Sequence, residues 1–373
     1  IQPPWIFLVL FNLASTASAL LSATRTHSLK TAVFIAFVST VAFSVSVVFD
    51  RTKLKDYATW LFIGVVGSCL FGFYQFFGDL GGLPGWLTGL RETYMKGGIF
   101  PFPRVQSTAL EPLYFANYLL VPLALLLLIQ AFIKGRVWPI SLGILSIITL
   151  SLSRGAQAAA ALVVIAAIGV TLYAKRAKQA LGLIATALAS VGLAFTLISL
   201  GAYMYPEYNG HKNTASNNVR QFADQATNVN QGESAEGRSL TRKLALGAAM
   251  QHPLVGIGPG NFGAYAVAQR PDKFTSREVI VNNETLEITA EQGFVGLALM
   301  AGFAITLLYA AYQAFRRSKE LASRVAIGGL TLGLFAIVLQ YQLFSTLYIM
   351  HIWVAIGFLA GLSCYHEHSQ TKK

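Results

Sequence analysis

Charged residues are scarce in this chain. Asp, Glu, Lys and Arg make up 12% of its 373 residues, whereas hydrophobic residues make up 54%. A soluble domain of this length carries about 25% charged residues. The shortage therefore excludes an ordinary water-soluble enzyme and indicates that lipid solvates most of the chain. We expect no separate soluble domain.

Cysteine is also scarce. Cys69 and Cys364 lie far apart, inside or at the end of apolar runs. Their spacing fits neither a disulfide framework nor a metal site, so we expect two small buried side chains. The first residue is Ile1 rather than Met, and we expect the chain to be a fragment or a processed product.

The formal net charge of +12 suggests at first a nucleic-acid-binding protein. Nucleic-acid binding needs a contiguous basic face. Here the basic residues are dispersed over short loops between apolar runs, so we exclude nucleic acid as a partner.

Apolar runs of about 18 or more residues recur along the chain, and each predicts a transmembrane helix. The expected fold class is all-α, a polytopic transmembrane helical bundle of about ten spans with one large, partly helical outer loop. The expected spans are residues 5–22, 31–49, 57–77, 112–133, 137–152, 156–174, 179–203, 293–315, 325–345 and 347–364.

Basic residues recur in every second loop, and the positive-inside rule places such loops in the cytoplasm. Arg25 and Lys30, in the first outward loop, depart from this rule. The basic loops contain Arg51, Lys53 and Lys55; Lys134 and Arg136; Lys175, Arg176 and Lys178; Arg316, Arg317, Lys319 and Arg324; and the terminal Lys372 and Lys373.

Two outward loops are long, residues 78–111 and 204–292, and long loops are usually functional. Within the second, Arg238–Gln251 predicts a short amphipathic helix that suits the membrane interface. We divide the chain into an N-terminal bundle of seven spans (1–203), a large extracytoplasmic loop with catalytic residues (204–292), and C-terminal spans with a cytoplasmic tail (293–373).

Arg154 and Arg238 are candidates for binding an anion. Arg154 lies between two apolar runs, where an unpaired cation is costly; a snorkelling anchor is the alternative, although the outward side disfavours it. Arg238 opens the amphipathic helix, where its guanidinium adds bidentate donors for phosphate; a solvated loop residue is the alternative. Arg104 also lies in an outward loop and is a candidate for substrate binding.

Three acidic residues precede the eighth span. Glu284, Glu287 and Glu291 are spaced so that they share one face of a helix. Carboxylates at a membrane boundary are costly and suggest function; a solvated first turn, favoured by the helix dipole, is the alternative. Residues 252–262, which we call the Gly-rich turn, contain glycines that permit close backbone approach. A loop that simply returns to the membrane is the alternative.

Four segments together resemble the O-antigen ligase and polymerase family of bacterial membrane proteins. Ser153-Arg154-Gly155 resembles its Ser-Arg-Gly corner, and Gly237-Arg238 resembles the arginine that opens its periplasmic helix. The Gly-rich turn matches the family's His-Pro-Leu-x-Gly-x-Gly-x-Gly-x-Phe pattern. Asn283–Gly296 resembles the family's helix that leads into the next span.

The resemblance implies a GT-C-like, multi-pass protein of the bacterial inner membrane with a periplasmic active face. It implies a metal-independent glycosyltransferase, without cofactor, that moves a preassembled glycan from undecaprenyl diphosphate to an acceptor hydroxyl on lipid A-core or a growing polysaccharide. The expected partners are this lipid-linked donor, a lipid or glycan acceptor, and membrane lipids. The candidate catalytic residues are Arg154, Arg238, Asn282, Glu284 and Glu287, and the candidate substrate-binding residues are Arg104, Asn283, His252, Gly258 and Gly260.

One position departs from the family. Many ligases have His where this chain has Asn282, and an amide cannot accept a proton near neutral pH. Either Glu284, Glu287 or His252 is the base, or hydrogen bonds alone orient the acceptor. A transporter or flippase of lipid-linked or small anionic substrates is the alternative function. It would place charged residues near mid-span on broken helices, and the spans here are nearly free of charge.

Overall fold

The computed structural model describes residues 2–98, 100–133, 136–208, 211–227 and 233–364. Regular secondary structure in this part of the chain is helical apart from the two-residue strands β1 (Glu207–Tyr208) and β2 (His211–Lys212), which pair antiparallel; turns and loops connect the helices. Apolar helices occupy all ten expected places, so the predicted polytopic all-α fold is confirmed. The predicted cytoplasmic residues Lys134, Lys372 and Lys373 lie outside the described residues.

Eight described helices are long and apolar enough to cross a membrane, judged by length and composition. The helix α12 begins at Glu284, before the expected start at about residue 293, because the acidic segment continues the helix. The eight are α1 (Pro3–Leu21), α2 (Arg25–Val48), α3 (Leu54–Leu80), α5 (Pro112–Phe132), α7 (Arg154–Tyr173), α8 (Ala177–Met204), α12 (Glu284–Arg317) and α13 (Leu321–Gln340). Two shorter apolar helices are α6 (Trp138–Leu150) and α14 (Met350–Cys364).

Short elements occupy the two long loops. The first contains α4 (Gly85–Thr88) and the 3₁₀ turn η2 (Glu92–Tyr94), and another 3₁₀ turn, η1 (Arg51–Lys53), precedes α3. The second contains α9 (Ala215–Thr227), α10 (Glu233–Gln251) and α11 (Phe262–Gln269). The predicted amphipathic helix is thus α10, which begins five residues before Arg238.

The chain divides into two compact units. Unit 1 comprises Ile1–Arg51, Asn230–Lys319 and Val338–Lys373, and unit 2 comprises Thr52–Val229 and Glu320–Ile337. In unit 1, α1 packs against α12 and α2 packs against α14, so both ends of the chain join its middle. The three segments expected from the sequence cut across these units, and that division stays a prediction.

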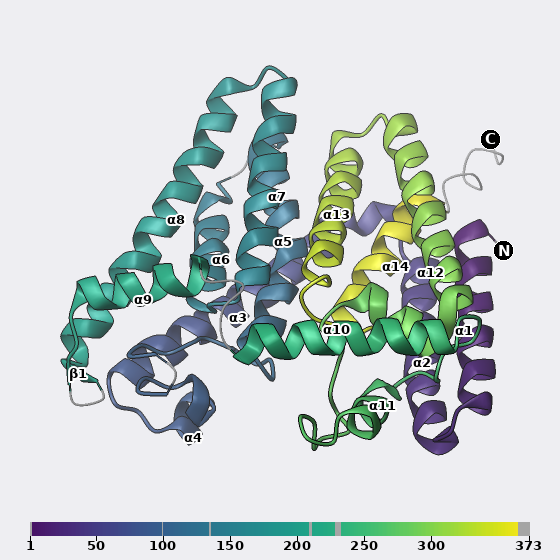
Figure 1. Ribbon diagram of the computed structural model, residues 1–373. Helices are drawn as coiled ribbons and strands as arrows, with labels where there is room; N and C mark the ends of the chain where they lie inside the picture. Colours follow the sequence, from purple (N-terminus) through teal and green to yellow (C-terminus); the bar gives the residue numbers. More distant parts are fainter. Residues whose placement is uncertain (1, 99, 134–135, 209–210, 228–232, 365–373) are drawn as a thin grey trace. The chain divides into compact units, whose positions relative to one another are not determined.

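In unit 1, helix ends that adjoin basic loops contact one another, and helix ends that adjoin the outward loops contact one another, as the alternating loops predict. Arg51, after α2, donates a hydrogen bond to the carbonyl of Leu362 near the end of α14. At the other end, Ser18 of α1 and Ser28 of α2 donate to carbonyls of the Gly-rich turn, at 2.5 and 2.9 Å. Figure 1 shows α10 running across this end of α12.

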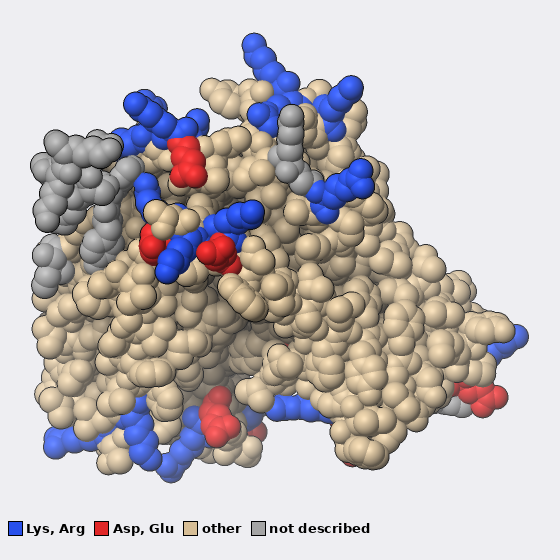
Figure 2. Space-filling view, turned by 180° about the vertical axis from the view of Figure 1, so that it is seen from behind, with Lys and Arg blue, Asp and Glu red and all other residues tan. Residues whose placement is uncertain are grey.

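Unit 2 shows the same alternation. Arg176, between α7 and α8, donates to the carbonyls of Ala131 and Phe132 at the end of α5, at 3.1 and 3.3 Å. At the opposite end, the Lys96 ammonium lies 5.2 Å from the ring centre of Tyr205, which follows α8. Figure 2 shows wide surfaces free of charged side chains between the groups of Lys and Arg on the face drawn, as expected of helices that lie in lipid.

Candidate active site

The helix α12 is broken at Gly293, whose φ is 69° and ψ is −176°. The break removes helical hydrogen bonds to the carbonyls of the preceding turn. Two amides of the Gly-rich turn replace them: Ile257 donates to the Ala290 carbonyl at 3.0 Å, and Gly258 donates to the Glu291 carbonyl at 2.8 Å. The Gly-rich turn therefore completes a broken helix.

Glycine is required on both sides of this contact. Gly256 has φ 68°, and an added Cβ would collide with the backbone of Glu291. At Gly293, an added Cβ would collide with the backbone of Leu254. Because both positions also need a left-handed backbone, only glycine allows the turn to pack on α12 without strain.

The candidate substrate-binding residues of the turn make contacts within the protein. The amide of Gly260 donates to Glu291 Oε2 at 2.7 Å, and the amide of Phe262 donates to Glu291 Oε1 at 3.0 Å. Glu291 therefore caps the start of α11, where a carboxylate is favoured. The Gly258 amide bonds the Glu291 carbonyl, and His252 is exposed at the end of α10. Binding of substrate by these residues stays a prediction.

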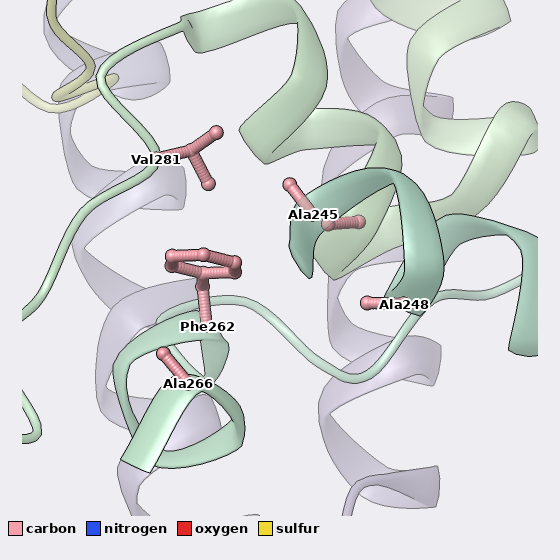
Figure 3. Packing of buried hydrophobic residues seen from close by; sticks show 6 residues of the cluster. Ala245, Ala248, Phe262, Ala266 and Val281 are labelled. Atoms are coloured by element: carbon pink, nitrogen blue, oxygen red, sulfur yellow. The ribbon is translucent and has the colours of Figure 1, made fainter. Parts of the chain in front are cut away.

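Small side chains fix α10 to this assembly. Ala245 and Ala248 of α10 are fully buried against Phe262 of α11 and Val281, as Figure 3 shows. Alanine permits close approach of α10, and the buried Phe262 ring fills the space beneath it. Arg238, on the same helix and half-buried, is held at this end of unit 1.

A cleft lies on the face of α12 that carries the predicted carboxylates. Leu286 and Ala290 of α12 pack with Ala245, Ala248 and Phe262, while the three acids of α12 line the cleft. The cleft is small: its volume of about 20 Å³ has room for about one water-sized group. We call it the acidic cleft, and its lining residues are Thr31, Ile35, Glu284, Glu287, Ile288, Glu291, Gln292, Leu347 and Tyr348.

The carboxylates of Glu284 and Glu287 are anchored by different partners. Glu284 Oε2 accepts a hydrogen bond from the Thr346 amide at 2.7 Å. Glu287 Oε2 accepts two, from the Val281 amide at 2.8 Å and from the Ser345 hydroxyl. Among the described residues no group of three His, Cys, Asp or Glu side chains is placed to hold a metal ion. The cleft therefore presents fixed carboxylate oxygens that suit hydroxyl donors.

The two asparagines before Glu284 shape the start of α12. Asn282 has a left-handed backbone, with φ 59°, which asparagine adopts more easily than most residues. The backbone N–H of Asn282 donates to Ser345 Oγ at 3.2 Å. Asn283 is the N-cap, and its Oδ1 accepts from the Leu286 amide at 2.9 Å. In this structure the left-handed backbone at residue 282 accounts for the asparagine, and no role in proton transfer is needed to explain it.

Unit 2 contains a second charged site, which we call the arginine corner: Tyr94, Arg104 and Ser151–Arg154. Arg104 Nε donates to the Ser151 carbonyl at 3.2 Å, and the guanidinium lies 5.3 Å from the Tyr94 ring centre. Burial lowers the pKa of Arg104, while Tyr94 and the nearby Glu111 act to raise it. A guanidinium withdrawn from water in this way is a strong anion-binding group.

The backbone of the corner is strained next to Arg154. Leu152 is buried with φ 53°, a left-handed conformation that costs free energy in leucine. The half-buried Arg154 follows as the first residue of α7, where free amides add to its attraction for anions. Arg104 and Arg154 thus belong to one unit and Arg238 to the other. Their convergence on one diphosphate stays a prediction.

Residues 139–301 match the model of the family described as O-Antigen ligase. This segment is an O-antigen ligase domain. It includes Arg154, Arg238 and the start of α12, so the predicted family is confirmed for this segment, whereas the candidate Arg104 lies outside it. No curated protein matches the chain.

The geometry adds functional candidates that the sequence analysis missed. Ser345 and Thr346 lie outside the O-antigen ligase domain but anchor its two acids, and Arg242 of α10 binds the same loop. Polar residues in a short link between two apolar helices were the available signal, but their partners are 58 and 62 residues away. Such pairings follow from tertiary packing, not from sequence pattern.

Proposed function

We propose that this protein is a membrane glycosyltransferase of the O-antigen ligase and polymerase class. It transfers a preassembled glycan from undecaprenyl diphosphate to an acceptor hydroxyl, on lipid A-core or a growing polysaccharide, at the periplasmic face. The observation that carries the proposal is the acidic cleft, in which Glu284 and Glu287 line one small opening within the O-antigen ligase domain. The cleft accommodates a hydroxyl-bearing group rather than a whole glycan.

Glu284 is the proposed base. An ionised carboxylate offers about four acceptor sites. Glu287 Oε2 already accepts two hydrogen bonds, whereas Glu284 Oε2 accepts one. Glu284 therefore retains more acceptor capacity toward the cleft, and Glu287 supports it by fixing Ser345. His252 does not line the cleft, which argues against it as the base.

The transfer step balances without a metal or cofactor. The acceptor oxygen attacks the sugar carbon that bears the diphosphate and forms the new glycosidic bond. The bond from this carbon to the diphosphate oxygen breaks, and its electron pair leaves with undecaprenyl diphosphate. The acceptor proton passes to Glu284, and general base catalysis of this kind contributes about 10²–10⁴-fold.

The arginines serve the leaving group. Arg104 is fixed by the Ser151 carbonyl and the Tyr94 ring, and Arg154 stands at the start of α7. Guanidinium groups held in place before the reaction stabilise charge as it develops on the diphosphate. Arg238 is proposed as the third cationic group, contributed by α10.

A transporter is the second candidate, and the break at Gly293 is the observation that favours it, because transporters use broken helices to bind ions. In such sites the carbonyls at the break are open to the ion. Here Ala290 and Glu291 accept hydrogen bonds from Ile257 and Gly258 instead. The break is filled by the protein's own backbone, which supports the enzyme.

A transfer assay with the purified protein separates the two functions. We would supply an undecaprenyl-diphosphate-linked glycan with an acceptor in detergent, and compare Arg154→Ala and Arg238→Ala with the exposed control Arg136→Ala. The enzyme predicts loss of product in the first two variants and normal product in the control. Movement of the donor across liposomes without any covalent product would establish the transporter.

A further inference from the structure

Arg242 of α10 links two segments that build the acidic cleft. Its Nη2 donates to the Gln342 carbonyl at 2.7 Å and lies 3.5 Å from the Asn282 carbonyl. Gln342 belongs to the loop after α13, and Asn282 belongs to the start of α12. One guanidinium therefore ties α10 to both segments within unit 1.

The loop held by Arg242 also holds the candidate base. The Glu284 amide donates to the Tyr341 carbonyl at 2.9 Å, and the Glu284 carboxylate accepts from the Thr346 amide. Between these two bonds lies Gln342, whose Oε1 accepts from Asn283 Nδ2 at 3.1 Å. A shift of the loop at Gln342 would therefore move the anchors of Glu284.

Stability does not explain an arginine at this position. Arg242 Nε is buried and has no hydrogen-bond partner among the described residues, and such a donor costs free energy. Arg238 lies one helical turn earlier on the same face, and like charges at this spacing repel. An uncharged apolar side chain would avoid both costs but would lose the contacts with Gln342 and Asn282, so the role of the arginine lies in these contacts.

We propose that Arg242 is a positioning residue for glycan transfer. It fixes the loop of residues 341–346 against α10, so that the Glu284 carboxylate keeps one orientation in the acidic cleft. The effect on rate rests on the proposed function, whereas the effect on the loop does not. Arg242 itself does not touch the reacting atoms.

The test uses the whole chain in detergent and four substitutions, of which Arg242→Ala serves for rescue by guanidinium ion. Arg242→Met removes the donors, Arg242→Lys keeps the charge and one donor group, and Lys243→Met alters the adjacent exposed cation as a matched control. We expect amide hydrogen exchange in residues 341–346 to rise about tenfold or more in Arg242→Met, to rise less in Arg242→Lys, and to stay unchanged in the control.

Kinetics supply the second readout. Misplacement of a catalytic group by about 1 Å costs about 100-fold in rate, so kcat should fall about 10- to 100-fold in Arg242→Met. The KM for the undecaprenyl-diphosphate-linked glycan should change less than about threefold, since uniform binding is untouched. Free guanidinium ion should restore part of kcat in Arg242→Ala.

Each outcome decides the proposal. Unchanged exchange in Arg242→Met overturns it, and so does raised exchange with unchanged kcat. A change confined to the donor KM also overturns it, because it assigns Arg242 to direct donor binding. If Arg242→Met does not fold, Arg242→Lys and guanidinium rescue of Arg242→Ala decide instead. If the unaltered protein transfers no glycan, the proposed function fails, while the exchange comparison still decides whether Arg242 holds the loop.

Discussion

In the acidic cleft of unit 1 the charged groups are carboxylates held by backbone amides, whereas in the arginine corner of unit 2 a guanidinium is held by a backbone carbonyl. Glu284 is bonded by the Thr346 amide, and Arg104 bonds the carbonyl of Ser151. Ser151 is the C-cap of α6, and helix ends leave such carbonyls without helical partners. Turns and helix ends leave backbone groups without helical partners. The carboxylates are held by such amides, and the guanidinium is held by such a carbonyl.

The two sites differ in how far their parts are separated along the chain. In the arginine corner, Arg104 bonds Ser151, which lies 47 positions away in the sequence. The remaining part, Ser151–Arg154, is continuous in sequence. The acidic cleft joins α2, α12 and residues 347–348, which come from all three segments of unit 1. The Ser-Arg-Gly motif describes one continuous part of the first site, and the spacing of the acids describes one wall of the second.

The largest expected effect is a difference in kcat between variants of the two acids of the cleft. Glu284→Gln should lower kcat about 10²–10⁴-fold, since it removes the proposed base. Glu287→Gln should lower kcat less, because its carboxylate mainly supports Ser345 and Val281. The exposed Glu278→Gln is the matched control. Initial rates of glycan transfer measure all three, and a larger loss in Glu287→Gln would reverse the assignment.

The next effect tests whether the arginine corner acts on the donor. Arg104→Ala should lower kcat/KM about 10²-fold, the loss typical of one preorganised charge-stabilising donor. Arg104→Lys should recover only part of it, because lysine lacks the planar fork that both bonds Ser151 and stacks on Tyr94. Normal kcat/KM in Arg104→Ala, alongside the control Arg136→Ala, would limit the corner to a structural role.

A third prediction concerns the break in α12 at Gly293. Gly293→Ala should destabilise the fold by about 1–3 kcal/mol, because alanine is strained at φ 69° and its Cβ meets the Leu254 backbone. Gly169→Ala in α7 has no neighbour within 4 Å of the added Cβ and should leave the melting temperature unchanged or slightly higher. Thermal unfolding in detergent compares the two; equal melting temperatures would mean that α12 does not require its break.

The smallest effect belongs to a charged pair outside both sites. A hydrogen bond with Arg270 lowers the pKa of Asp272 to about 2. Because this pKa lies below the ordinary value of about 3.9, any stabilisation is present at neutral pH and is lost as the pH falls through about 2. The pair is exposed to solvent and screened. Asp272→Asn should therefore change the melting temperature at pH 7 by less than about 2 °C, and a larger shift would show that this pair orders the loop after α11.

The sequence predicts the spans well because each helix must be apolar over about 18 or more residues to lie in lipid. It also places Glu284, Glu287 and Glu291 on one helical face, since helical spacing is local. It does not show that Glu291 serves α11 while Glu284 faces Thr346. Those roles depend on which amides lie opposite each carboxylate.

The Gly-rich turn shows the same division. Its glycines are visible in the sequence, and their freedom of φ indicates a close backbone approach. That the partner is the break at Gly293 appears only in the structure.

By itself, then, the amino-acid sequence determined the helical membrane fold, the alternating basic loops and the O-antigen ligase motifs, because all of these depend on local composition and spacing. Tertiary structure alone decided that Ser345 and Thr346 anchor the acids of the cleft, that Arg242 bonds the same loop, and that Asn282 directs the backbone. The physical reason is that hydrogen bonds between segments about 60 or 100 residues apart form only after packing brings a donor to its acceptor.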